Sequence, residues 1–139
     1  MKLDSIVFDC IDAAPLARFW SAALGWSVAP YDEDELARLR GEGVTDPEDD
    51  PSVLVEPPED SDLPTLFFTE VPEDKMVKNR VHLDLVADTA IEDDVERLRG
   101  LGATLRNWAE ESGSVWAVMQ DPEGNEFCVL PPEEDLGLG

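Results

Sequence analysis

The amino-acid sequence predicts an α+β fold in which two βαβββ modules follow one another. An internal repeat is the first reason: an apolar strand containing an acid occurs at Ile6–Cys10 and again, 75 residues later, at Val81–Leu85. A helical stretch follows each strand, and Gly25 and Gly102 end these stretches 77 residues apart. Three strand-like segments then follow each glycine. Matching features at nearly one offset indicate a duplicated structural unit.

The helix of the first module is predicted at 14–24 by the spacing of its apolar residues. One stripe of a helix surface would carry Leu16, Phe19, Trp20, Ala23 and Leu24. Asp12 stands where it can cap the first turn, and Gly25 can adopt the left-handed conformation that often ends a helix.

The helix of the second module is predicted at 90–101. Thr89 and Glu92 have the spacing of a capping box, and Gly102 follows the last apolar position. The inward-facing residues of this helix would be Ile91, Val95, Leu98 and Leu101.

The remaining strands are short segments rich in apolar residues. In the first module they are predicted at Trp26–Pro30, Ser52–Glu56 and Thr65–Val71, and in the second at Ala103–Trp108, Ser114–Gln120 and Asn125–Leu130. Asp121–Gly124 joins the last two as a turn.

Between the first and second of these strands, Tyr31–Asp50 is strongly acidic, and we expect a mobile insertion in which Glu35–Arg40 forms a short helix or another strand. The chain is therefore read as one domain, 1–139. Its first module is 1–74, with the acidic insertion at 31–50, and its second module is 75–139.

The charge of the chain excludes two classes of partner. With 33 Asp and Glu against 10 Lys and Arg, the net charge of −23 would repel nucleic-acid phosphates and anionic lipid headgroups. No apolar segment reaches the length of a membrane span, and the N-terminus does not resemble a signal peptide. We therefore expect a cytoplasmic protein in which Cys10 and Cys128 are thiols.

In a βαβββ unit the helix covers one face of the sheet, and the other face curves into half of a cup. Alternation along the strands assigns side chains to the two faces. The apolar positions belong under the helices, which leaves Val7 and Asp9 of the first module on the cavity side. In the second module the same parity exposes His82 and Asp84 on the first strand and Glu126 and Cys128 on the last.

Three motifs carry a resemblance to a known family. They are Leu16–Trp20 with Leu24-Gly25-Trp26, then Lys78–Leu85, and finally Asp121–Leu130. In this order the motifs resemble the vicinal-oxygen-chelate superfamily of glyoxalases, bleomycin-resistance proteins and extradiol dioxygenases, and most of all its glyoxalase-like branch. The resemblance implies a mostly antiparallel, cup-shaped sheet with helices on the outside. It also implies a homodimer, because relatives with this fold commonly pair module against module.

The resemblance implies metal-ligand positions on the first and last strands of each module. Here those positions hold Val7, Thr69, His82 and Cys128. Valine cannot coordinate a metal, and threonine is rarely a ligand, so a tightly held metal is not favoured. A shift of one residue would replace Thr69 by Glu70. His82, Cys128 and Glu70 are then the set that could hold Zn, Ni, Fe or Mn.

Several side chains keep two interpretations. His82 is a ligand or an acid–base group, or else it is hydrogen-bonded inside the cup to Asp84 or Glu126; these three residues are the catalytic candidates. Cys128 is a nucleophile or an inert buried thiol. Trp116 and Phe68 line a pocket for flat compounds or belong to the core. The expected ligand-binding set is Val7, Asp9, Phe68, Glu70, His82, Asp84, Trp116, Glu126 and Cys128.

Two functions therefore remain open. The first is a protein that binds a small organic molecule in the cup without a tightly held metal, like the bleomycin-resistance relatives. The alternative is a divalent-metal-dependent lyase, isomerase or dioxygenase acting on a substrate with two neighbouring oxygens.

Overall fold

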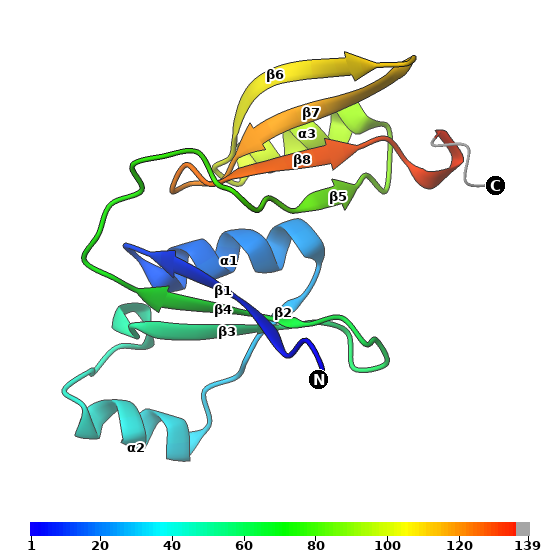
Figure 1. The fold of residues 1–139 in the computed structure, drawn as a ribbon. Coiled ribbons are helices and arrows are strands. Elements are labelled where there is room, and N and C mark those ends of the chain that lie inside the picture. Colours follow the sequence, from blue (N-terminus) through cyan, green and yellow to red (C-terminus); the bar gives the residue numbers. More distant parts are fainter. Residues whose placement is uncertain (136–139) are drawn as a thin grey trace. The chain divides into compact units, whose positions relative to one another are not determined.

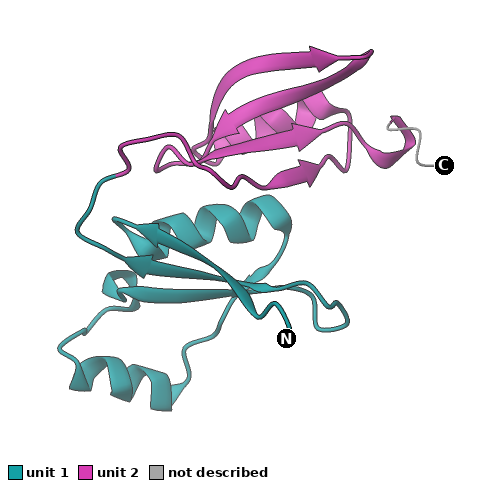
Figure 2. Ribbon diagram, viewed as in Figure 1, with its two compact units in different colours: residues 1–74 teal, residues 75–139 magenta. Residues whose placement is uncertain are grey.

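A computed structural model describes residues 1–135, and the chain divides into two compact units, residues 1–74 and 75–139 (Figures 1 and 2). We call them the first and the second module. Each contains one four-stranded mixed sheet and one helix that packs on it, so the predicted α+β fold of tandem βαβββ modules is confirmed.

The sheet of the first module has the order β1-β4-β3-β2. Strand β1 pairs with β4 in parallel, and the other two pairs are antiparallel. The elements along the chain are β1 (Ser5–Cys10), α1 (Ala13–Leu24), β2 (Ser27–Val28), α2 (Glu33–Gly41), the 3-10 turn η1 (Pro47–Asp49), β3 (Ser52–Glu56) and β4 (Thr65–Glu70).

The sheet of the second module repeats this topology in the order β5-β8-β7-β6, again with one parallel pair, β5 and β8. Its elements are β5 (Asp84–Val86), α3 (Ile91–Gly100), β6 (Thr104–Glu111), β7 (Ser114–Gln120), β8 (Glu126–Leu130) and the 3-10 turn η2 (Glu133–Asp135). Strand β5 is shorter than predicted and begins after His82, although Cys128 N still donates to Leu83 O at 3.0 Å.

Each core lies between the helix of a module and its sheet. In the first module Phe8 packs against Trp20 and Phe68, with ring centroids 5.3 and 4.9 Å apart, and Leu16 is 1% exposed. In the second module, helix residues Val95 and Leu98 are buried, as are the strand residues Ala117, Met119, Phe127 and Val129. Most of the apolar residues predicted to face inward on the two helices pack on the sheets, but Leu101 does not: it follows the last residue of α3 and is 39% exposed.

The two helices begin differently from the prediction. Asp12 is the N-cap residue of α1 without a side-chain cap bond to the helix, and Oε2 of Glu70 accepts a hydrogen bond from Ala13 N at 3.1 Å instead. The capping box predicted for α3 is wrong, because its N-cap residue is Ala90 and makes no side-chain cap bond. Asp94 takes over this role: its Oδ2 accepts from Asp88 N and Thr89 N at 2.8 and 3.1 Å.

Within the acidic segment 31–50, expected to be a mobile insertion, Glu35–Arg40 was predicted to form a short helix or another strand, and the structure has the helix. The mobility of this segment stays a prediction. The segment contains helix α2, whose N-cap Asp32 accepts from Glu35 N at 2.8 Å. Leu39 of this helix is 1% exposed. The phenol of Tyr31 donates to the Asp50 carboxylate at 2.8 Å, and burial, followed by that bond, raises the pKa of Tyr31.

Among residues 1–135 no helix is long and apolar enough to cross a membrane. Two other expectations concern arrangements beyond a single module, namely the cup that the two halves would enclose and the homodimer. Both stay predictions.

Candidate functional site

A pocket of about 490 Å³ lies on the open face of the second module's sheet, the face that does not carry α3. Its apolar wall comes from β6, β7 and β8, and polar side chains come from the segment before β5 and from β5 and β8. The lining residues are Lys78, His82, Asp84, Ala109, Trp116, Val118, Glu126, Phe127, Cys128 and Leu130. An apolar hollow with a few convergent polar groups is the usual form of a ligand site.

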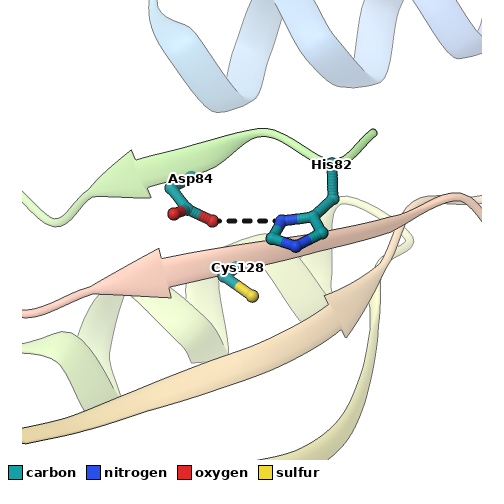
Figure 3. A group of neighbouring side chains, drawn as sticks. All are labelled: His82, Asp84 and Cys128. Carbon is teal, nitrogen blue, oxygen red and sulfur yellow. Dashed lines mark ion pairs between the residues drawn. The ribbon is translucent and has the colours of Figure 1, made fainter. Parts of the chain in front are cut away.

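Three side chains that lie together form the polar side of this pocket (Figure 3). Asp84 and Cys128 are partners in the parallel pairing of β5 with β8, so their side chains lie side by side on one face. His82, two residues before Asp84, reaches the same place. Its Nδ1 is 3.3 Å from Oδ1 of Asp84, and the potential ligand atoms of all three lie within 4.8 Å of one another.

The Cys128 thiol is kept protonated by its surroundings. Its pKa is raised, first by burial, and then by the negative charge of Asp84 and the hydrogen bond between this carboxylate and the thiol. Lys78 acts in the opposite direction. Because the thiolate is the nucleophilic form, this arrangement favours an inert thiol over a nucleophile.

Glu126, although it lines the pocket, is already engaged. Its side chain is 6% exposed, and its two carboxylate oxygens accept from Lys75 Nζ at 3.0 Å and Asn79 N at 3.1 Å. Burial opposes its ionisation, but the bonds from Asn79 and Lys75 outweigh burial and hold the pKa of Glu126 below its usual range. Glu126 therefore fixes the segment 75–79 against β8, which leaves it poorly placed as a catalytic base.

The first module has the same frame with different side chains. Asp9 pairs with Thr69 across β1 and β4, as Asp84 pairs with Cys128. Val7, which is 55% exposed, stands where the second module has His82. This open face therefore offers one carboxylate, Asp9, and no imidazole or thiol at the equivalent positions.

Two residues assigned to the cavity lie elsewhere. Phe68 pairs with Phe8 in register, is 0% exposed and belongs to the core under α1, so its assignment to the pocket is wrong; Phe67 takes the open face. Glu70 pairs with Cys10 and caps α1, so it does not provide a third metal ligand beside His82 and Cys128. In both cases the predicted position along the strand was off by one residue, and a shift of one residue moves a side chain to the opposite face of the sheet.

Other lining residues of the pocket were not predicted from the sequence. Val118 and Leu130 each lie two positions after a predicted pocket residue, Trp116 on β7 and Cys128 on β8, and so face the same side of the sheet. The alternation of side chains along these strands would therefore have predicted them. Lys78 lies in an irregular segment and has no such signal.

A second hollow, of about 390 Å³, lies in the first module between α2 and the sheet, lined by residues that include Tyr31, Arg38, Asp50 and Phe67. It depends on α2, which was not firmly predicted.

The residues at the expected ligand positions do not fit the divalent metal that enzymes of the superfamily bind. Two of the four expected positions hold Val7 and Thr69, and the third alternative, Glu70, caps α1. Among residues 1–135 the only group of three possible donors is His82, Asp84 and Cys128, and two of its members, His82 and Asp84, already face each other at 3.3 Å.

Two tandem modules, each a helix on a four-stranded mixed sheet, define the fold of the vicinal-oxygen-chelate superfamily. A family model described as "glyoxalase-like domain" matches residues 5–130, and the chain belongs to this family. A sequence search of the curated proteins finds no match.

Solved structures share the fold at low sequence identity. A glyoxalase/bleomycin resistance protein/dioxygenase family enzyme from Burkholderia phytofirmans PsJN has a TM-score of 0.66 at 18% identity, covering 94% of this chain and 98% of that chain. A glyoxalase-related enzyme from Fulvimarina pelagi has a TM-score of 0.61 at 15% identity, covering 94% and 88%. Lactoylglutathione lyase from Agrobacterium tumefaciens has a TM-score of 0.56 at 12% identity, covering 95% and 94%.

Proposed function

We propose that the second module binds a small, partly aromatic organic molecule in its pocket and does so without a tightly held metal. The observation that carries the proposal is the composition of the pocket: Trp116, Val118 and Leu130 offer an apolar surface beside the His82–Asp84 pair. Such a surface takes the body of a ligand, and the polar pair fixes its orientation.

Titration calorimetry with 4-methylanisole, a small neutral aromatic compound, tests the proposal. Trp116→Ala is expected to weaken binding roughly tenfold, because a lost aromatic contact is worth about 1.4 kcal/mol. Trp108→Ala is the matched control: Trp108 is 41% exposed and pairs with Ala117, so it lies on the other face of the same sheet. Equal effects of the two substitutions would contradict the proposed site.

A divalent-metal enzyme acting on vicinal oxygens is the second candidate, and the cluster of three donors within 4.8 Å is the observation that favours it. Elemental analysis of protein purified without chelator separates the two candidates. The proposed function requires well under one equivalent of zinc, nickel, iron or manganese and a melting temperature that EDTA leaves unchanged. One equivalent of metal that is lost in His82→Ala and Cys128→Ser would establish the enzyme candidate instead.

A further inference from the structure

We infer that the ligand of this pocket carries a hydroxyl or N–H donor, as a phenol does, which Nε2 of His82 accepts, while Asp84 positions the imidazole. The inference rests on the proposed function and adds to it the chemical class of the ligand.

The first step is the proton on the His82 ring. Nδ1 lies 3.3 Å from Oδ1 of Asp84. A carboxylate oxygen only accepts, so two lone pairs would repel one another at this distance unless Nδ1 carried the hydrogen. In the neutral imidazole Nε2 is then the acceptor. Asp84 thereby selects which ring nitrogen is left for a ligand.

The second step is that Nε2 is available. The side chain of His82 is 42% exposed and lines the pocket. No residue within 1–135 donates a hydrogen bond to this nitrogen. A ligand that buried the ring without a donor would leave Nε2 unsatisfied, which is unfavourable in a desolvated site.

The third step is that the neighbouring polar groups are already occupied. Glu126 accepts from Lys75 and Asn79, and the thiol of Cys128 is hydrogen-bonded to Asp84. Asp84 faces both the His82 ring and the Cys128 thiol. Nε2 of His82 is then an acceptor without a partner beside the apolar wall of Trp116, Val118 and Leu130. An aromatic ring with a hydroxyl matches both parts, the ring on the wall and the hydroxyl on Nε2.

The experiment compares 4-methylphenol with its O-methyl ether, 4-methylanisole, whose oxygen cannot donate a hydrogen bond. Titration calorimetry should give the phenol a roughly three- to tenfold higher affinity for the wild type, the usual effect of one net hydrogen bond. His82→Phe keeps a flat ring but removes the acceptor, and it should abolish this preference while still binding the anisole. Asp93→Asn, which changes an exposed acid in the first turn of α3 outside the pocket lining, should leave the preference unchanged.

Asp84 is a positioning residue in this scheme, and nitrogen NMR gives it a readout of its own. His82 is the single histidine of the chain, so its ring nitrogens need no assignment. The wild type should show the hydrogen on Nδ1, and Asp84→Asn should move the population toward Nε2–H and reduce the preference for the phenol. A purely structural role of Asp84 would leave the tautomer unchanged.

The outcomes separate the inference from the proposed function. Equal affinity for the two ligands, a preference that survives in His82→Phe, or a wild-type hydrogen on Nε2 overturns the inference and leaves the proposed function standing. If neither ligand binds the wild type, the proposed function fails, and the inference fails with it.

Discussion

Asp84 is the residue on which the polar side of the pocket depends. It faces the His82 imidazole on one side and the Cys128 thiol on the other, and it lies opposite Cys128 in the β5–β8 pairing. One carboxylate therefore has two effects: it favours the hydrogen on Nδ1 of His82, and together with burial it keeps Cys128 protonated.

Two substitutions should change the reactivity of Cys128 in opposite directions. Burial and Asp84 raise the pKa of this thiol, so Asp84→Asn should lower the pKa, increase the thiolate at pH 8 and accelerate alkylation by iodoacetamide several-fold. Lys78 acts the other way, so Lys78→Ala should slow the reaction. Mass spectrometry of the modified peptides measures both rates. Cys10, which is 2% exposed, is the internal control.

If both substitutions accelerated alkylation, greater access to the thiol would be the cause, and the electrostatic explanation would be wrong.

The sequence predicted the polar part of the site better than its apolar part. Alternation along short strands places His82, Asp84 and Cys128 on one face, because His82 and Asp84 are two positions apart in the sequence and the strand pairing aligns Asp84 with Cys128. The predicted positions of Phe68 and Glu70 were wrong because β4, a strand of six residues, has apolar side chains on both faces. The hydrophobic pattern of β4 then does not show which side chains face the helix, and only the pairing of β4 with β1 does.

At the scale of elements, α3 shows how a helix start can depend on one buried carboxylate. Asp94 is 7% exposed, and besides Asp88 N and Thr89 N it faces Nε of Arg97 at 3.4 Å. Burial opposes its ionisation, but the bonds from Thr89, Asp88 and Arg97 outweigh burial, so the pKa of Asp94 is lowered. The charged form is therefore the one that stabilises the fold.

Asp94→Ala should reduce the free energy of unfolding by about 1–2 kcal/mol at pH 7, the usual cost of a lost cap. Because the folded-state pKa lies below the unfolded value near 3.8, this stability is present above that pH and is lost as pH falls through the folded pKa. Urea denaturation at pH 7, 5 and 3 should show the gap between wild type and variant narrowing at the lowest pH.

Asp93→Ala is the control, since Asp93 is exposed in the same turn. It should cost only a few tenths of a kcal/mol, roughly the contribution of a charge near the helix dipole. A gap for Asp94→Ala that stayed constant down to pH 3 would contradict the role of its charge.

The two packed helices and most strands could be predicted because their apolar residues repeat with a clear period. Helix α2 could not be predicted firmly, because its sequence is polar and the net charge of its segment suggested disorder. In this segment the spacing of oppositely charged residues matters more for helix formation than the net charge does. Arg38 lies 2.8 Å from Glu35 and 3.1 Å from Glu42, one helical turn away on either side, so opposite charges meet locally within an acidic segment.

At the scale of the whole molecule, the unbalanced charge is the main feature. The chain has 33 acids and 10 bases, so most carboxylates have no cation available to them. Pairs such as Arg18 with Glu48, at 2.5 Å, are exposed and contribute little to stability. Repulsion among the remaining carboxylates should oppose the folded state.

Stability should therefore rise with ionic strength. The melting temperature is expected to increase by several degrees between low salt and about 0.5 M NaCl, because the Debye length falls from about 30 Å at 0.01 M to a few ångströms near 1 M. Differential scanning calorimetry at pH 7 measures the change. Sodium chloride and sodium bromide at equal ionic strength should have the same effect, and a melting temperature that stayed flat would contradict the idea.

The parallel pairing of β1 with β4 also sets the order in which the chain can fold during synthesis. Strand β1 leaves the ribosome first, but its partner Thr65–Glu70 follows about 60 residues later. At about 5–20 residues per second, this strand waits roughly 3–12 s for its partner. During that time Ile6 and Phe8 have no sheet to join, and β3 and β4 can pair only at the end of the wait. Strand β1 is thus made well before the strand on which it docks, and over that interval the nascent chain presents an apolar segment that a chaperone could bind.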